Sequence, residues 1–178
     1  PYFKLENVVD GIFTIAKRLY QLEFKEVTNI PKYHEDVRTF EVYDERDGKF
    51  ISLFYADFFP RETKKGGAWM TNFRSQGLHH GEVLRPHVAI VCNFTKPTKT
   101  KPSLLNLDEV LTLFHEFGHA LHGMLSQCRY TNLSGTNVFW DFVELPSQIM
   151  ENWVLEKKFF SKKFGKLSLY KNKDEMMK

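Results

Sequence analysis

Three of the seven histidines in this 178-residue chain fall within eight residues, in the run His115-Glu116-Phe117-Gly118-His119-Ala120-Leu121-His122. On a helix, His115 and His119 lie one turn apart, about 6 Å in rise and about 40° in rotation. Their imidazoles therefore reach the same point in space, as two ligands of one tetrahedral ion require. Glu116 would stand beside the open side of that ion, where its carboxylate can accept a proton from water. This spacing is the H-E-x-x-H pattern of zinc metallopeptidases.

A catalytic zinc site needs a third protein ligand and leaves its fourth position to water. His122 lies two turns from His115, roughly 10 Å along the axis, so its ring does not converge easily with the other two. We expect His122 to support the site or to pack nearby. A carboxylate on the next helix is the better candidate, but spacing alone does not separate Glu144 from Asp141 or Glu151. The alternative for the histidines is a helix whose partly buried imidazoles are hydrogen-bonded without a metal. The alternative for the carboxylates is an acidic helix face exposed to solvent.

Apolar residues at three-and-four spacing predict the helices that would hold these groups. The first thirty residues are predicted to be helical from Leu5 onward, and Pro31 ends the pattern. A second helix starts at Asn106, with Glu109 in the reciprocal capping position, and its pattern fades by Cys128. This helix carries the histidines.

A third helix is predicted from near Asp141 to about Phe160, with Pro146 in its first turn, where the missing N–H costs nothing. Its spacing divides the residues into two faces. The face expected toward the core contains Phe142, Leu145, Ile149 and Trp153, and the other face contains Glu144, Gln148 and Glu151.

Runs rich in β-branched and aromatic residues predict strands at 39–44, 50–57, 68–73 and 87–94. The first two flank Asp47-Gly48, a pair that can adopt the positive φ angles of a tight hairpin turn. The flexible Gly66-Gly67 precedes the third. We therefore predict an α+β fold, a small antiparallel-rich sheet packed with helices, as one domain over residues 1–178.

Composition restricts the class of protein further. Apolar residues make up 42% and charged residues 26%, the balance of a globular protein, and apolar runs such as 88–92 are far too short to span a membrane. The net charge is +3, but eight lysines from Lys157 onward against Asp174 and Glu175 leave −3 on residues 1–156. That distribution argues against a basic nucleic-acid-binding domain. A module that binds nucleic acid or acidic lipid through the lysine-rich end is the remaining alternative.

Two further features concern the origin of the chain. Cys92 and Cys128 form no CxxC motif, which favours two packed thiols in a reducing, cytoplasmic compartment. A start at Pro1 instead of Met suggests a processed protein or a piece of a longer one.

Four segments resemble the M3, or thimet oligopeptidase, family of zinc metallopeptidases, and the likeness runs from about residue 40 to about 156. The segments are Gly66-Gly67-Ala68-Trp69-Met70, Leu113 to His122, Leu133-Ser134-Gly135-Thr136, and Phe142-Val143-Glu144-Leu145-Pro146-Ser147-Gln148. The resemblance implies a zincin-like fold that binds one Zn²⁺ through His115, His119 and Glu144, with Glu116 as the catalytic base. It further implies hydrolysis of short peptides, as in peptidyl-dipeptidases or oligopeptidase A.

The resemblance also bears on the substrate and on the extent of the chain. It favours an edge strand at Gly67, Ala68 and Trp69 that pairs with the peptide, over a simple turn before a buried Trp, and it makes His122 and Gln148 supporting residues. Family members are several times longer, with a helical domain before this segment and substrate-holding tyrosines and a histidine after it. We therefore expect missing segments of the parent enzyme among the partners. The alternative function is a zinc-binding fragment with little or no activity by itself.

Overall fold

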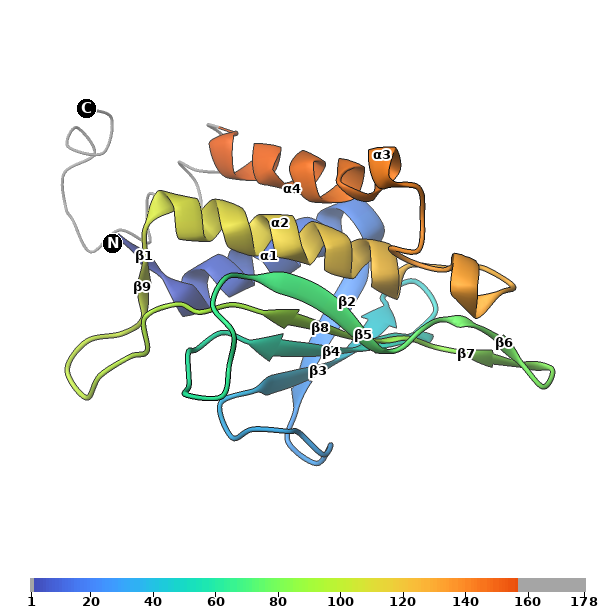
Figure 1. The fold of residues 1–178 in the computed structure, drawn as a ribbon, viewed down its shortest axis with the longest axis horizontal. Coiled ribbons are helices and arrows are strands. Elements are labelled where there is room, and N and C mark those ends of the chain that lie inside the picture. Colours follow the sequence, from blue (N-terminus) through green and yellow to red (C-terminus); the bar gives the residue numbers. More distant parts are fainter. Residues whose placement is uncertain (1, 157–178) are drawn as a thin grey trace.

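The computed structural model describes residues 2–156 and has mixed helix and sheet, as predicted (Figure 1). Helix α1 (Leu5–Tyr20) follows the apolar spacing and buries one face. It ends at Gln21, which adopts a left-handed conformation with φ 56°. The chain then turns into strand β2 (Leu22–Val27), where Phe24 stacks on Phe13 of α1 with ring centroids 4.1 Å apart. The helix prediction for the first thirty residues is thus correct to Tyr20 and wrong beyond it.

The main sheet has five strands in the order β2-β3-β4-β8-β5. Its remaining members are β3 (Arg38–Asp44), β4 (Phe50–Asp57), β5 (Trp69–Arg74) and β8 (His87–Val91). Only β4 and β8 pair in parallel, so the sheet is antiparallel-rich, as expected. Gly48 takes φ +70° in the β3–β4 turn, which confirms the hairpin. Strand β5 lies at the sheet edge, and no other strand within residues 2–156 pairs with its outer side.

Two small strand pairs were not expected from the sequence. Strand β1 (Phe3–Lys4) pairs with β9 (Leu104–Leu105) beside the start of α1. Strands β6 (Gly77–His79) and β7 (Glu82–Leu84) form a hairpin that projects away from the helices (Figure 1). Both pairs are too short for period-two alternation to reveal them.

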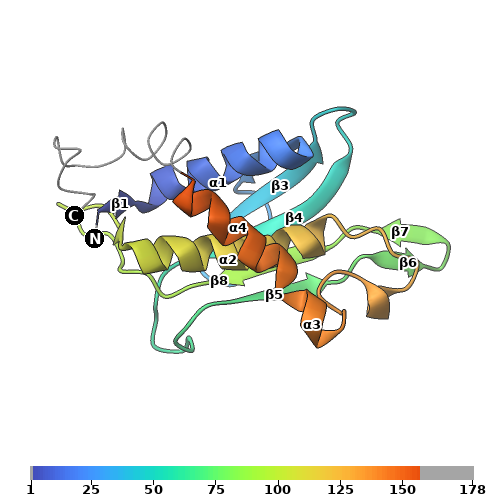
Figure 2. The ribbon, with the colours of Figure 1, turned by 90° about the horizontal axis from the view of Figure 1, so that it is seen from above.

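Helix α2 (Leu107–Met124) lies across one face of the sheet, with α1 beside it and the last helix above it (Figures 1 and 2). The predicted capping box is present: Asn106 and Glu109 exchange side-chain-to-backbone hydrogen bonds of 2.8 Å each. Rings from α1, α2 and the sheet meet in one core, where Phe54 and Phe117 are 5.7 Å apart. No helix within residues 2–156 is long and apolar enough to cross a membrane.

The third predicted helix is divided in two by Glu144, into α3 (Trp140–Val143) and α4 (Leu145–Leu155). A short 3-10 turn (Thr131–Leu133) precedes them. Pro146 occupies the first turn of α4, as expected, whereas the predicted end near Phe160 lies outside the described residues. The lysine-rich end, from Lys157 onward, lies outside them as well.

The predicted core face of the last helix is wrong for Phe142, Leu145 and Ile149, whereas Trp153 packs against the core. The residues of α4 that are buried are Ser147, Met150 and Val154. The residues expected there, Phe142, Leu145 and Ile149, are 47%, 47% and 49% exposed, and Trp153 is only partly buried. Spacing could not anticipate this rotation because small Ser147, and not a large apolar residue, lies where α4 comes nearest to α2.

Candidate metal centre

Three side chains that can bind a metal converge between α2 and the start of α4. Glu144 Oε2 lies 3.1 Å from His115 Nε2 and 3.2 Å from His119 Nε2. The ligand atoms of all three residues lie within 4.8 Å of one another. Two ligands at about 2.05 Å from a tetrahedral ion are about 3.3 Å apart, so the donor spacing fits a site of zinc size. Two imidazoles and one carboxylate are also a donor set that zinc accepts while leaving a position open.

Glycine at position 118 lets α4 come close enough to supply the carboxylate. A Cβ on Gly118 would lie 2.5 Å from Ser147 Cα and 2.6 Å from the Pro146 carbonyl oxygen. Both distances are shorter than any tolerated contact. The glycine inside the histidine motif is therefore required by the crossing of α2 and α4, and this crossing brings Glu144 over the two imidazoles.

The Glu144 carboxylate is held by the next turn of its own helix. Ser147 Oγ donates to Glu144 Oε2 at 2.7 Å and to the Glu144 carbonyl at 2.9 Å. This hydrogen bond from Ser147 lowers the pKa of Glu144, and the nearby His119 and His115 lower it further. The carboxyl is thus kept in the charged form that a cation needs, although 48% of the side chain is exposed.

The two imidazoles have different surroundings. His115 Nδ1 lies 2.6 Å from Glu151 Oε1, so a carboxylate orients this ring from the side opposite Nε2. His119 is more buried, and its Nδ1 has no hydrogen-bond partner among residues 2–156. Burial lowers the pKa of His119, which favours the neutral imidazole that metals bind.

Glu116 lies deeper than the three converging groups, at 7% exposure. Burial raises the pKa of its carboxyl, and the nearby His115 opposes the rise. Edge strand β5 packs against the histidine helix, where the Met70 side chain reaches Gly123 of α2. A carboxylate in this place can act as a proton acceptor near the converging ligands.

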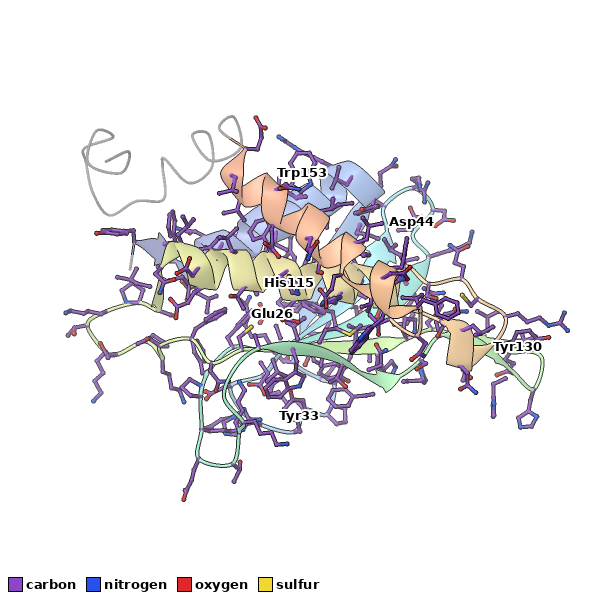
Figure 3. The ribbon with its side chains drawn as sticks, turned by 45° about the horizontal axis from the view of Figure 1, so that its top comes forward. Glu26, Tyr33, Asp44, His115, Tyr130 and Trp153 are labelled. Atoms are coloured by element: carbon purple, nitrogen blue, oxygen red, sulfur yellow. The ribbon has the colours of Figure 1, made fainter. Side chains whose placement is uncertain are left out.

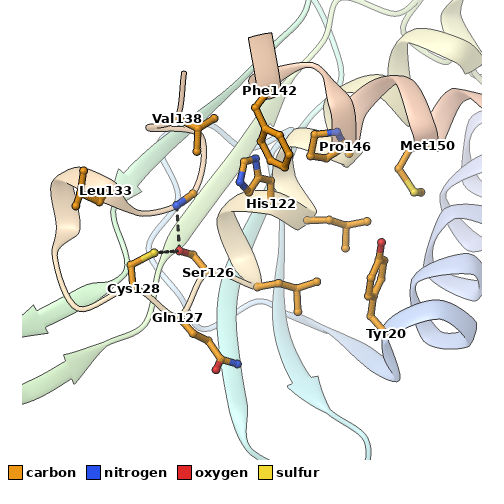
Figure 4. A pocket seen from close by; sticks show the side chains of 14 residues that line it. Tyr20, His122, Ser126, Gln127, Cys128, Leu133, Val138, Phe142, Pro146 and Met150 are labelled. Atoms are coloured by element: carbon orange, nitrogen blue, oxygen red, sulfur yellow. Dashed lines mark hydrogen bonds between the residues drawn. The ribbon is translucent and has the colours of Figure 1, made fainter. Parts of the chain in front are cut away.

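The other candidate residues lie around this centre. Asp141 is exposed on α3, and Gln148 is exposed on α4, where its backbone N–H donates to the Glu144 carbonyl. His122 lies beside the Phe142 ring, 6.0 Å between centroids, and lines an apolar pocket of about 470 Å³ on the side of α2 away from the sheet (Figure 4). Its Nδ1 is buried without a hydrogen-bond partner in the described part of the chain.

The segment expected to bind substrate lies at the start of β5, with Gly67 and Ala68 before the strand instead of in it. Gly67 has φ +91°, a conformation that favours glycine, and Trp69 begins the edge strand. Ala68 and Trp69 are partly buried.

Sequence reasoning did not identify Ser147 or Gly118 as contributors to the site. A hydroxyl three residues after a carboxylate on one helix is a signal for Ser147, because such residues are neighbours on the helix surface.

Comparison with known proteins agrees with the resemblance found in the sequence. The profile described as Peptidase family M3 matches residues 1–176. Dipeptidyl carboxypeptidase of Salmonella typhimurium is 48% identical over 163 residues, which are 91% of this chain and 24% of that protein. Oligopeptidase A of Escherichia coli is 46% identical over 158 residues, 88% of this chain and 23% of that protein. The thimet-like oligopeptidase of Dictyostelium discoideum is 44% identical over 159 residues, which are 88% of this chain and 24% of that protein.

The chain therefore belongs to Peptidase family M3, a family of metallopeptidases. It spans about a quarter of the length of the curated relatives it matches.

Proposed function

We propose that this chain is the zinc-binding core of a metallopeptidase that hydrolyses short peptides. The observation that carries the proposal is the convergence of His115, His119 and Glu144 within 4.8 Å beside the buried carboxylate of Glu116. Membership of Peptidase family M3 supports the same reaction class. In this proposal the three converging residues hold one Zn²⁺, and the core is zincin-like, with a histidine helix and a following helix that contributes the third ligand.

When bound, zinc would act as a Lewis acid and lower the pKa of a water molecule toward ~7. The protein supplies the proton transfer. The Glu116 carboxylate accepts the proton of the attacking water and then delivers it to the departing amine nitrogen. Burial suits Glu116 to both steps, because it brings the pKa of the carboxyl closer to neutral pH than that of a solvated Glu.

The substrate is proposed to lie extended along the free edge of β5. Residues two apart in an antiparallel strand present their N–H and C=O groups to the same side. Met70 pairs with Ile90 of β8 on one side, and no strand within residues 2–156 pairs with the other side of β5. A peptide that pairs there gains main-chain hydrogen bonds near the helix that carries the base, which is the mode of β-strand addition.

The test is zinc analysis of the purified chain together with cleavage of a quenched-fluorescent peptide. We expect one zinc per chain, and we expect Glu116→Gln to abolish cleavage while the zinc remains. Glu62→Gln, a change at an exposed carboxylate, is the matched control and should cleave like the parent. Cleavage that survives in Glu116→Gln would reject Glu116 as the base.

A second candidate is a zinc-binding fragment that does not turn over substrate by itself. It is favoured by the span of the chain, which is 24% of the dipeptidyl carboxypeptidase that it matches, and by the half-exposed Glu144. It predicts full zinc occupancy without peptide cleavage, and activity only when the remaining polypeptide of the parent enzyme is supplied. The same preparation therefore separates the two candidates.

A further inference from the structure

The loop of residues 58–67, here called the β4–β5 loop, joins β4 to the edge strand. Asp57, the last residue of β4, pairs with Val91 on one side of β8, and Trp69 pairs with the same Val91 on the other side. The loop therefore leaves the sheet on one side of β8 and rejoins it on the other side, and both points lie next to Val91. Its path decides where the edge strand begins.

The side chain of Lys64, in this loop, is buried and forms hydrogen bonds with residues near the start of the loop. The Lys64 side chain is 2% exposed. Its Nζ donates to the Asp57 carboxylate at 2.9 Å, to the Asp57 carbonyl at 3.0 Å and to the Phe59 carbonyl at 2.7 Å. An ammonium group has three N–H donors, and Lys64 uses all three on Asp57, the last residue of β4, and Phe59, near the start of the loop.

Other side chains complete the charge balance of Asp57, which is itself fully buried. Arg61 Nη1 donates to Asp57 Oδ1 at 2.9 Å, and the Tyr33 hydroxyl donates to Oδ2 at 3.1 Å. Figure 3 shows Tyr33 on the side of the sheet opposite the helices. The carboxylate thus joins the loop to the segment that covers the far face of the sheet.

A second clamp holds the end of the loop. Asn93 Nδ2 donates to the carbonyls of Lys65 and Gly67, at 2.8 Å each. Asn93 follows β8, so these bonds fasten the last loop residues to the strand that the edge strand pairs with. Lys64 and Asn93 therefore fix the two ends of the loop independently.

The energetics indicate that these buried polar contacts fix the position of the loop more than they add to the free energy of unfolding. Burying a charged pair has a large desolvation cost, and apolar residues of similar size often stabilise a fold as well or better. Here every donor of Lys64 and Asn93 goes to the loop or to its starting residue. Trp69 and Met70 follow Gly67 closely and begin β5, which packs against α2, so a shift of the loop end would move the start of the edge strand relative to the helix that carries Glu116.

We propose that Lys64 and Asn93 are positioning residues that clamp the β4–β5 loop and so hold the start of the edge strand, at Trp69 and Met70, where an extended peptide can pair with it near the helix that carries Glu116. The inference rests on the proposed peptidase function for its substrate, but the clamp itself can be measured without turnover. It assigns to these residues a role in peptide binding and none in bond cleavage.

The first measurement is amide hydrogen exchange of the zinc-loaded chain. Lys64→Met and, as a milder change, Asn93→Ala should each speed exchange of the amides at 68–72 on the order of tenfold, because local opening becomes easier. Amides of β3 serve as an internal reference and should not change. Lys96→Met is the matched control, because it removes a lysine from an exposed ion pair with Asp36, outside this loop.

The second measurement separates peptide binding from chemistry. With a quenched-fluorescent peptide, both loop variants should raise KM about fivefold or more, with kcat within about twofold of the parent, because they weaken binding and leave the cleavage groups intact. Zinc content should equal that of the parent.

Three results would overturn the inference: exchange at 68–72 unchanged in both variants, exchange raised equally in β3, or a loss of kcat at constant KM. If the parent chain cleaves no peptide, the proposed activity of this chain fails, and the exchange results still decide whether the clamp exists.

Discussion

Glu151 Oε1 lies 2.6 Å from His115 Nδ1, on the side of the imidazole opposite the Nε2 atom that approaches Glu144. A carboxylate in this position fixes the ring orientation and makes the other nitrogen a better metal donor. Glu151 was one of three carboxylates that helix spacing left as a possible third ligand. Its contact shows that it orients His115 and does not join His119 at the point of convergence.

Removing this support should weaken metal binding. We expect Glu151→Gln to reduce zinc affinity about 10- to 100-fold, because the amide orients His115 without the negative charge. Competition with a coloured chelator measures the affinity, and Glu62→Gln, at an exposed site away from the centre, is the control. Parent-like affinity in Glu151→Gln would show that the contact does not act on the metal site.

A methyl group at position 118 should separate α4 from α2. The added Cβ would lie 2.5 Å from Ser147 Cα, so Gly118→Ala should lower the free energy of unfolding by about 1–3 kcal/mol and weaken zinc binding as Glu144 moves away. Gly66→Ala is the matched control, because nothing lies within 4 Å of its added Cβ. Urea unfolding and chelator competition report the two effects, and normal zinc affinity in Gly118→Ala would contradict the crossing argument.

The buried Asp57 should make stability depend on pH. Burial opposes ionisation of this carboxyl, but hydrogen bonds from Arg61 and Lys64 outweigh it and hold its pKa below the usual 3.8. Because the folded pKa is depressed, the stabilisation is present above about 3.8 and is lost as the pH falls through the folded value. Asp57→Asn should therefore lower the free energy of unfolding by about 3 kcal/mol at pH 7.

The difference between parent and Asp57→Asn should shrink as the pH is lowered below 3.8, where the parent also becomes protonated. Urea titrations of the metal-free chain at several pH values measure it. Asp141→Asn, an exposed carboxylate, should change stability by less than about 0.5 kcal/mol. A difference that stays constant with pH would mean that the charge of Asp57 does not matter.

Two aromatic residues before α4 should promote self-association. Phe139 and Trp140 are 88% and 87% exposed, and Phe142 and Ile149 nearby are about half exposed. Such an apolar surface favours association. Changing Phe139 and Trp140 together to Ser should lower the sedimentation-average mass at high concentration, whereas Tyr130→Ser, at a 62% exposed site outside this surface, should not. Equal masses for all three chains would contradict the prediction.

The sequence by itself determined the histidine helix and much of the sheet. The capping box at Asn106, the apolar spacing around His115 and His119, and the Asp47-Gly48 turn are local signals, because each depends on residues only a few positions apart. For the same reason the edge strand after Gly67 could be anticipated from its composition.

Helix spacing did not decide which carboxylate meets the two imidazoles; the family resemblance indicated Glu144, and only the tertiary structure shows why it is the one. The choice among Asp141, Glu144 and Glu151 depends on the break between α3 and α4, and on the close crossing that Gly118 permits against Pro146 and Ser147. Strand β2 also depends on tertiary contacts, because Phe24 stacks on Phe13 of α1 and the β2 backbone pairs with β3. Periodicity describes one element at a time, whereas a ligand set requires the relative positions of two.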